Sequence, residues 1–146
     1  MSPLLAAEAG EFVITDVDEL VYRQITEPLM EAETWTPSSI AFAPNSFDQK
    51  KPSFARQTLT TPQDARDWHN ENAKKPSLGV WACSIGEVID AKSQTIDDSG
   101  VTRAANAVVA PGHCYVDYRE LTKSETRLLR STLLAKALAR KELTTV

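Results

Sequence analysis

The chain has 146 residues, of which 42% are hydrophobic and 25% are charged, and its 20 acidic and 16 basic side chains give a formal net charge of −4. This length and composition are typical of one globular domain. The acidic balance disfavours a chain devoted to duplex DNA, and charged residues interrupt every apolar stretch before the ~20 positions that a membrane span needs. The N-terminus lacks a basic start followed by a long apolar segment, so the sequence predicts a cytoplasmic protein with no membrane partner.

Cysteine and glycine spacing limits the chemistry that we expect. Cys83 and Cys114 form neither a CxxC pair nor a zinc-ligand spacing, which predicts reduced thiols packed as small apolar groups. The glycines form no phosphate-binding loop, and the acidic residues form no metal-binding motif. We therefore expect no metal and no cofactor.

The first part of the chain gives mixed signals. Residues 1–14 are weakly patterned and predict a loosely ordered arm, so that 15–146 form the single domain. Phe12, Val13 and Ile14 could instead add a short edge strand. Residues 17–25 fit one face of a helix and also the alternation of a strand, and both interpretations stay open. Residues 38–42 and 53–59 are each predicted to form a short strand.

A helix is predicted over residues 62–73. Thr61 suits the N-cap position and Pro62 the first helical position, which together indicate where this helix begins. Its apolar stripe is expected to bury Trp68 and to place His69 at the edge of the packed face.

The second half of the chain alternates strands with a long connection. Residues 78–88 are nearly continuously apolar and predict a central strand covered on both faces. Residues 90–112 predict a long hairpin or excursion, with Asp97 and Asp98 as solvated carboxylates in its turn. Residues 113–118 predict the next strand.

A second helix is predicted over residues 123–141, because Thr122 and Glu125 have the spacing of a capping box. Apolar residues cover more than half of its circumference, so it is either deeply docked or also contacts a partner. The mixture of elements predicts an α+β domain, a mostly antiparallel sheet packed by the central helix 62–73 and the C-terminal helix 123–141.

One predicted strand carries a polar row. Period-2 geometry places His113, Tyr115, Asp117 and Arg119 on one face, which is either the solvent side of the sheet or a ligand-binding face. His113 and Asp117 would be ~13 Å apart along the strand, too far to pair. Any partner of His113 must therefore come from elsewhere in the chain.

The chain has two histidines, His69 and His113. They could supply the acid and the base of a metal-independent RNA cleavage. Arg56, predicted on the same side of its strand as Phe54, could hold the phosphate, as could Tyr115 or Arg119. This hypothesis requires the two imidazoles to converge on one site.

Charge is distributed unevenly between the two ends. Residues 1–33 carry a net charge of −7 and residues 119–146 a net charge of +4. The basic C-terminal helix, which includes Arg127 and Arg130, predicts a macromolecular partner. A protein is favoured over a nucleic acid because this helix lacks interleaved aromatic residues, and a homodimer in which the two ends meet is a further prediction.

Several short motifs resemble those of a group of small bacterial cytoplasmic proteins for which no activity is established. The motifs are Tyr22-Arg23-Gln24, Pro37–Phe42, Ser53–Arg56, Thr60–Pro62, Gly79–Trp81, Gly86-Glu87 and Pro111–Asp117. The resemblance implies a free-standing domain. A site shared with that group would fall on the polar residues Ser39, Arg56, His69, His113 and Asp117.

Two hypotheses for function follow from these patterns. The leading one is a non-enzymatic binding or regulatory module that uses the basic helix or the 113–119 face, with binding residues Arg119, Arg127, Arg130, Tyr115, Asp117 and Ser39. The alternative is a small, toxin-like, metal-independent RNA-directed enzyme, with His113 and His69 as acid and base and Arg56 as a further catalytic residue.

Overall fold

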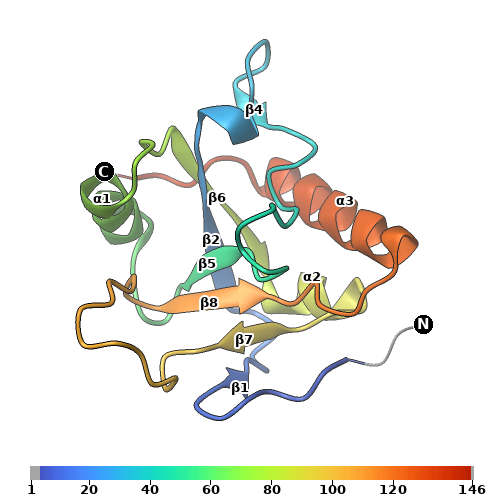
Figure 1. Ribbon diagram of the computed structural model, residues 1–146. Helices are drawn as coiled ribbons and strands as arrows, with labels where there is room; N and C mark the ends of the chain where they lie inside the picture. Colours follow the sequence, from blue (N-terminus) through green and yellow to red (C-terminus); the bar gives the residue numbers. More distant parts are fainter. Residues whose placement is uncertain (1–3, 146) are drawn as a thin grey trace.

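The computed structural model describes residues 4–145 and confirms the α+β class with a mostly antiparallel sheet. Six strands lie in the order β1-β7-β8-β5-β2-β6, and every neighbouring pair is antiparallel (Figure 1). They are β1 Phe12–Val13, β2 Leu20–Ile25, β5 Ser53–Arg56, β6 Gly79–Ser84, β7 Thr95–Asp97 and β8 His113–Val116. The remaining elements are η1 Glu27–Leu29, the hairpin β3 Met30–Glu31 and β4 Thr36–Pro37, and the helices α1 Pro62–Asn72, α2 Ile85–Asp90 and α3 Lys123–Arg140.

Alternation along the strands divides the apolar side chains between two clusters. Val21 and Cys83 belong to the larger cluster, which includes the buried α3 residues Leu129 and Leu133. Tyr22, Val80 and Ala82 belong to a smaller cluster with Ala65 of α1. The sheet is therefore covered by α2 and α3 on one side and only partly by α1 on the other.

Both predicted long helices are confirmed, and each ends one residue earlier than expected. The Thr61 hydroxyl accepts a hydrogen bond from the Asp64 amide at 3.1 Å, and Thr122 and Glu125 form the expected capping box. One prediction for α1 is wrong, because Trp68 is only half-buried. It lines a pocket instead of entering the core.

Two strand predictions need correction. Residues 38–42 form consecutive turns, in which the Ala41 amide donates to the Ser38 carbonyl and the Ala43 amide to the Ile40 carbonyl, each at 3.1 Å. Residues 78–88 are not one strand, because Ser84 caps α2 with its own capping box. The strand that precedes Ser84, β6, lies at the edge of the sheet and not at its centre.

The open side of β6 is covered by the C-terminal segment. The Leu143 amide donates to the Val80 carbonyl, and the Arg140 guanidinium donates to the Ala82 carbonyl, each at 2.9 Å. Both acceptors point away from β2, the only strand that pairs with β6. The edge carbonyls are therefore satisfied without a further strand.

The N-terminal segment, expected to be a loosely ordered arm, runs beside β7 (Figure 1). Its strand β1 pairs with β7, and Ile14 is buried. The Gln94 amide donates to the Leu5 carbonyl at 2.8 Å, and the Tyr115 hydroxyl donates to Glu11 at 2.9 Å. These contacts come from residues distant in sequence.

Candidate active site

The position of His113 follows from the register of three strands. β8 lies between β5 and β7, with Ala55 opposite His113 on one side and Asp97 opposite Cys114 on the other. The β7 register continued by one residue brings Asp98 across from His113. On β5, Ser53 lies two residues from Ala55 and therefore on the same face as His113.

Gly112 fixes the approach of the chain to His113. Its φ of +70° lies in the left-handed region, and its carbonyl accepts a hydrogen bond from the Arg56 amide at 2.9 Å. A Cβ at this position would meet the Leu59 Cβ at 3.1 Å. The left-handed conformation therefore favours glycine, and a Cβ would fit here only if Leu59 shifted by a few tenths of an ångström.

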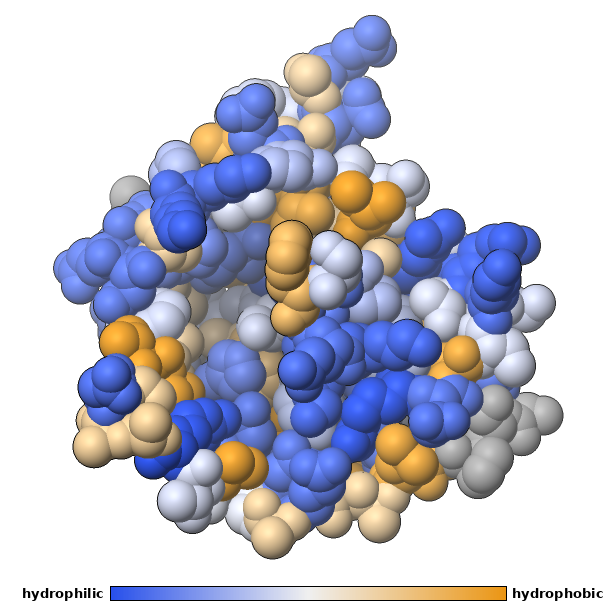
Figure 2. All heavy atoms as spheres, viewed as in Figure 1, coloured by the Kyte–Doolittle hydropathy of each residue, from blue (hydrophilic) through white to orange (hydrophobic). Residues whose placement is uncertain are grey.

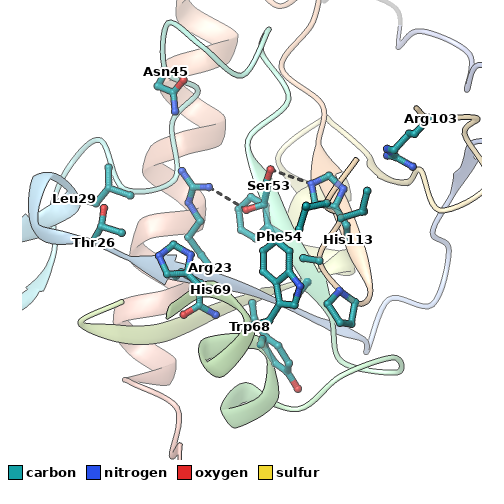
Figure 3. Close-up of a pocket in the computed structure, with 18 residues that line it drawn as sticks. Arg23, Thr26, Leu29, Asn45, Ser53, Phe54, Trp68, His69, Arg103 and His113 are labelled. Atoms are coloured by element: carbon teal, nitrogen blue, oxygen red, sulfur yellow. Dashed lines mark hydrogen bonds between the residues drawn. The ribbon is translucent and has the colours of Figure 1, made fainter. Parts of the chain in front are cut away.

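The His113 imidazole is hydrogen-bonded through both of its nitrogens. Nδ1 lies 2.8 Å from an Asp98 carboxylate oxygen. Nε2 lies 3.0 Å from the Ser53 hydroxyl (Figure 3). Because a carboxylate only accepts, Nδ1 carries the proton, and in the neutral imidazole Nε2 accepts from the Ser53 hydroxyl. The three side chains have the contacts that activate a serine as a nucleophile.

Asp98 is held from two directions. Besides His113, Arg103 binds its carboxylate at 3.0 Å and its backbone carbonyl at 3.1 Å. The prediction that Asp97 and Asp98 are solvated is wrong, because their exposed fractions are 1% and 8%. Because the Asp98 carboxylate is buried and is also held by Arg103, it keeps the His113 imidazole in one orientation.

Ser53 and His113 open onto a pocket of about 520 Å³ between α1 and the loop that precedes β8, where the space-filling view is hollowed (Figure 2). The pocket forms because β2 and β5 pair only at Val21 with Arg56 and Tyr22 with Ala55 and then separate. Trp68, Phe54 and Tyr22 supply aromatic walls. This volume is in the range of small-molecule sites.

His69 and His113 line the same pocket, so the structure brings the two predicted histidines together. His69 Nε2 lies 2.7 Å from the Lys75 carbonyl, which can only accept, so this nitrogen carries a proton. His69 comes from α1 and His113 from β8, on separate walls of the pocket (Figure 3).

Arg23, which lies within one of the sequence motifs but was not predicted to be a site residue, also lines the pocket. Its Nε donates to the Ala41 carbonyl at 2.9 Å, and its guanidinium lies over the Phe54 ring. Its Nη1 donates to the Ser53 carbonyl, also at 2.9 Å (Figure 3). Burial lowers the pKa of Arg23. The negative charge of Asp48 acts in the opposite direction, although Asp48 forms no ion pair with Arg23. No carboxylate of residues 4–145 forms an ion pair with this cation.

Arg56 is not part of the pocket. It binds Glu19 through Nε at 3.0 Å and Nη2 at 2.7 Å, and Asp97 through Nη1 at 2.8 Å. Glu19 and Asp97 have exposed fractions of 3% and 1%. The Arg56 guanidinium is therefore committed to two internal carboxylates, and the expectation that it holds a phosphate beside His113 is corrected.

The polar row that begins at His113 is not an open face. Tyr115 and Asp117 are 1% and 2% exposed. Tyr115 binds Glu11, and Asp117 accepts from Gln94 at 2.9 Å and from Arg119 Nε at 2.9 Å. The N-terminal segment covers this face, so an accessible 113–119 surface is also corrected.

The remaining predicted binding residues lie elsewhere on the surface. Ser39 is exposed in the turns that precede Phe42 and does not line the pocket. Arg127 and Arg130 project from α3 beside a second hollow of about 280 Å³, which Lys50 and Lys123 also line. None of these four basic side chains forms an ion pair with a carboxylate of residues 4–145.

Comparison with known proteins adds no constraint. No family model matches the chain, and no curated protein or solved structure matches it closely enough to show a relationship. In residues 4–145, no three or more His, Cys, Asp or Glu side chains gather as a metal site would require. Within the same residues no helix has both the length and the apolar composition of a membrane span.

Proposed function

We propose that this protein is an enzyme that cleaves an ester or amide with Ser53 as its nucleophile. The observation that carries this proposal is the pair of hydrogen bonds at His113, 3.0 Å to Ser53 and 2.8 Å to Asp98, at the wall of a pocket. The Ser53 side chain is exposed, so a substrate carbonyl can reach its hydroxyl. Geometry of this kind, more than any single residue type, defines a nucleophilic serine site.

The proposed reaction has two steps. Ser53 Oγ attacks the carbonyl carbon while His113 Nε2 takes the hydroxyl proton, and the same proton then passes to the departing alcohol or amine as the bond to it breaks. Water then attacks the acyl-serine and gives a proton to His113 Nε2. As the bond between the acyl carbon and Ser53 Oγ breaks, His113 returns that proton to Oγ, which releases a carboxylic acid and regenerates the free serine. Asp98 holds the imidazole and stabilises its cationic form throughout.

An organofluorophosphonate probe tests the nucleophile directly, because it phosphonylates an activated serine. We expect labelling at Ser53 in the wild type and none in S53A, with a loss of about 10³-fold or more in labelling rate for H113A. S39A is the matched control, since Ser39 is exposed but has no histidine partner. Labelling of S53A at the wild-type rate would refute the proposal.

The RNA-directed alternative retains one supporting observation, which is that His69 and His113 line a single pocket. In that reaction His113 would be the base and His69 the acid, while Ser53 would not react. Cleavage of labelled single-stranded RNA that survives S53A but is lost in both H69A and H113A would replace the serine mechanism with this one.

A second candidate function is binding of an acidic protein segment by the α3 surface. Lys50, Lys123, Arg127 and Arg130 surround one hollow without an ion-paired carboxylate from the described chain. A polyglutamate peptide is a suitable probe, and we expect R127E/R130E to lose binding and K74E/K75E, on the opposite side of the sheet, to retain it. Preferential binding of single-stranded RNA of equal charge would instead favour a nucleic-acid partner, and salt-dependent sedimentation would reveal a homodimer.

A further inference from the structure

The pocket beside Ser53 is positively charged in a protein that is acidic as a whole. Its lining includes two arginines and two histidines, and no aspartate or glutamate is found among the described residues that line it. The whole chain, by contrast, has 20 acidic and 16 basic residues. A recess whose charged side chains have one sign attracts a ligand of the opposite sign.

The two arginines of the pocket differ in what they contact. Arg103 is neutralised by Asp98 at 3.0 Å, whereas Arg23 donates only to the Ala41 and Ser53 carbonyls. The Arg23 Nη2 makes no hydrogen bond within residues 4–145. A desolvated guanidinium with only neutral partners can gain a charge-assisted pair of hydrogen bonds from an anion.

Gln24, the next residue of β2, supplies a second unmet requirement. It lines the same pocket, and its Oε1 is buried without a hydrogen-bond partner in the described structure. This oxygen can only accept, so its complement is an N–H or O–H group of the ligand. The Arg23 guanidinium at the pocket wall therefore lacks an anion, and the Gln24 amide oxygen lacks a hydrogen-bond donor.

We propose that the substrate of the Ser53 site is a small carboxylate-bearing acyl compound, whose carboxylate binds Arg23 and whose amide N–H or hydroxyl donates to Gln24. This assignment rests on the proposed function only in naming the bond that is cleaved. The guanidinium edge of Nη1 and Nη2 matches a carboxylate, and Nη1 already lies 2.9 Å from the Ser53 carbonyl, so the anion binds next to the nucleophile.

Binding is measured by calorimetry on S53A, with N-acetylalanine and its C-terminal carboxamide as a matched pair of probes. Both retain the N–H for Gln24, and they differ in one charge. We expect the acid to bind about 10-fold more tightly or better, and R23Q to abolish that ratio. Equal affinity of S53A for the two probes would overturn the proposal, as would tighter binding of a phosphate analogue of the same size. Because this probe comparison needs no change at Arg23, it stands even if R23Q fails to fold.

Turnover separates this inference from the function on which it rests. The substrates are p-nitrophenyl hemisuccinate and its methyl ester, which again differ in one charge. We expect the wild type to favour the charged ester through a lower KM, and R23Q to remove that preference. An equal fall of kcat on both esters in R23Q would overturn the assignment and place Arg23 at the developing oxyanion. Hydrolysis without a charge preference refutes the inference alone, whereas selective binding of N-acetylalanine without hydrolysis of either ester refutes the serine mechanism alone.

Discussion

The two ends of β5 differ in how a partly buried arginine near each end is paired. At one end Arg56 is paired with two buried carboxylates, Glu19 and Asp97. At the other end Ser53 faces a pocket where Arg23 donates hydrogen bonds only to carbonyl oxygens and pairs with no carboxylate of the described residues. Because an unpaired buried charge is costly, a cation that the fold leaves without an anion indicates where a ligand completes the structure, whereas a fully paired cation indicates stability.

The largest effect is expected at the paired end. R56M leaves Glu19 and Asp97 buried without their cation, so we expect the free energy of unfolding in urea to fall by about 3–5 kcal/mol. R127M, which removes an exposed cation with no ion-paired carboxylate among the described residues, should change it by less than about 0.5 kcal/mol. An equal loss of unfolding free energy in R56M and R127M would show that the buried ion pairs of Arg56 do not stabilise the fold.

Acid should weaken the same cluster. Burial alone raises the pKa of the Glu19 carboxyl, but hydrogen bonds from Arg56 and Thr58 bring it below its ordinary value of 4.5. The pKa of Asp97 is likewise below its ordinary 3.8, because Ser99 and Arg56 outweigh burial. A depressed pKa contributes stability that is present above the ordinary value and is lost as pH falls through the folded value.

Urea unfolding from pH 6 to pH 2.5 measures that loss. The wild type should lose stability progressively below about pH 4.5, and E19Q, with one titrating group fewer, should show a shallower slope. E27Q is the control, because Glu27 is exposed. A slope for E19Q as steep as that of the wild type would show that Glu19 does not carry the acid response.

A smaller effect is expected at Gly112, which connects the two ends through the Arg56 amide. G112A must adopt a φ of +70° and place its Cβ against Leu59, so we expect a loss of about 1–2 kcal/mol and slower labelling of Ser53 as His113 shifts. G112N tolerates this φ better and should recover part of the loss. Wild-type behaviour of G112A would show that the backbone here is not constrained.

The smallest effect on stability is expected at the unpaired end. R23Q removes hydrogen bonds to neutral carbonyls and also relieves a desolvated charge, so the free energy of unfolding should change by about 1 kcal/mol or less. Thermal and urea unfolding check this value. A loss as large as that of R56M would mean that Arg23 serves the fold and not a ligand.

Local signals in the sequence predicted the helices well and the strands less well. The caps at Thr61 and Thr122 involve residues three apart, so the sequence alone locates them. Ser84 and Glu87 are also three residues apart and form a capping box. They lie within the apolar run 78–88, which favoured one long strand over the observed change from β6 to α2. Residues 38–42 have a strand-like composition and still form turns.

The candidate site was only half visible in the sequence, because it depends on register. The two histidines stood out by their rarity, and both line the pocket. Asp98 and Ser53 could not be recognised as partners of His113 from the sequence. A one-residue shift in the register of either neighbouring strand would give His113 a different partner. Arg56 was placed on the expected side of its strand, but its anions come from Glu19 and Asp97, 37 and 41 residues away.

The contact of Leu143 with β6 has a consequence for self-association. A segment without regular structure, together with the Arg140 side chain, occupies the hydrogen-bonding positions that a seventh strand would use. If that segment detaches, the freed carbonyls of Val80 and Ala82 become a template for the same edge of a second molecule, and two sheets can join into one continuous sheet. The resistance of this protein to edge-to-edge aggregation is thus set by how firmly residues 140–143 are held against β6.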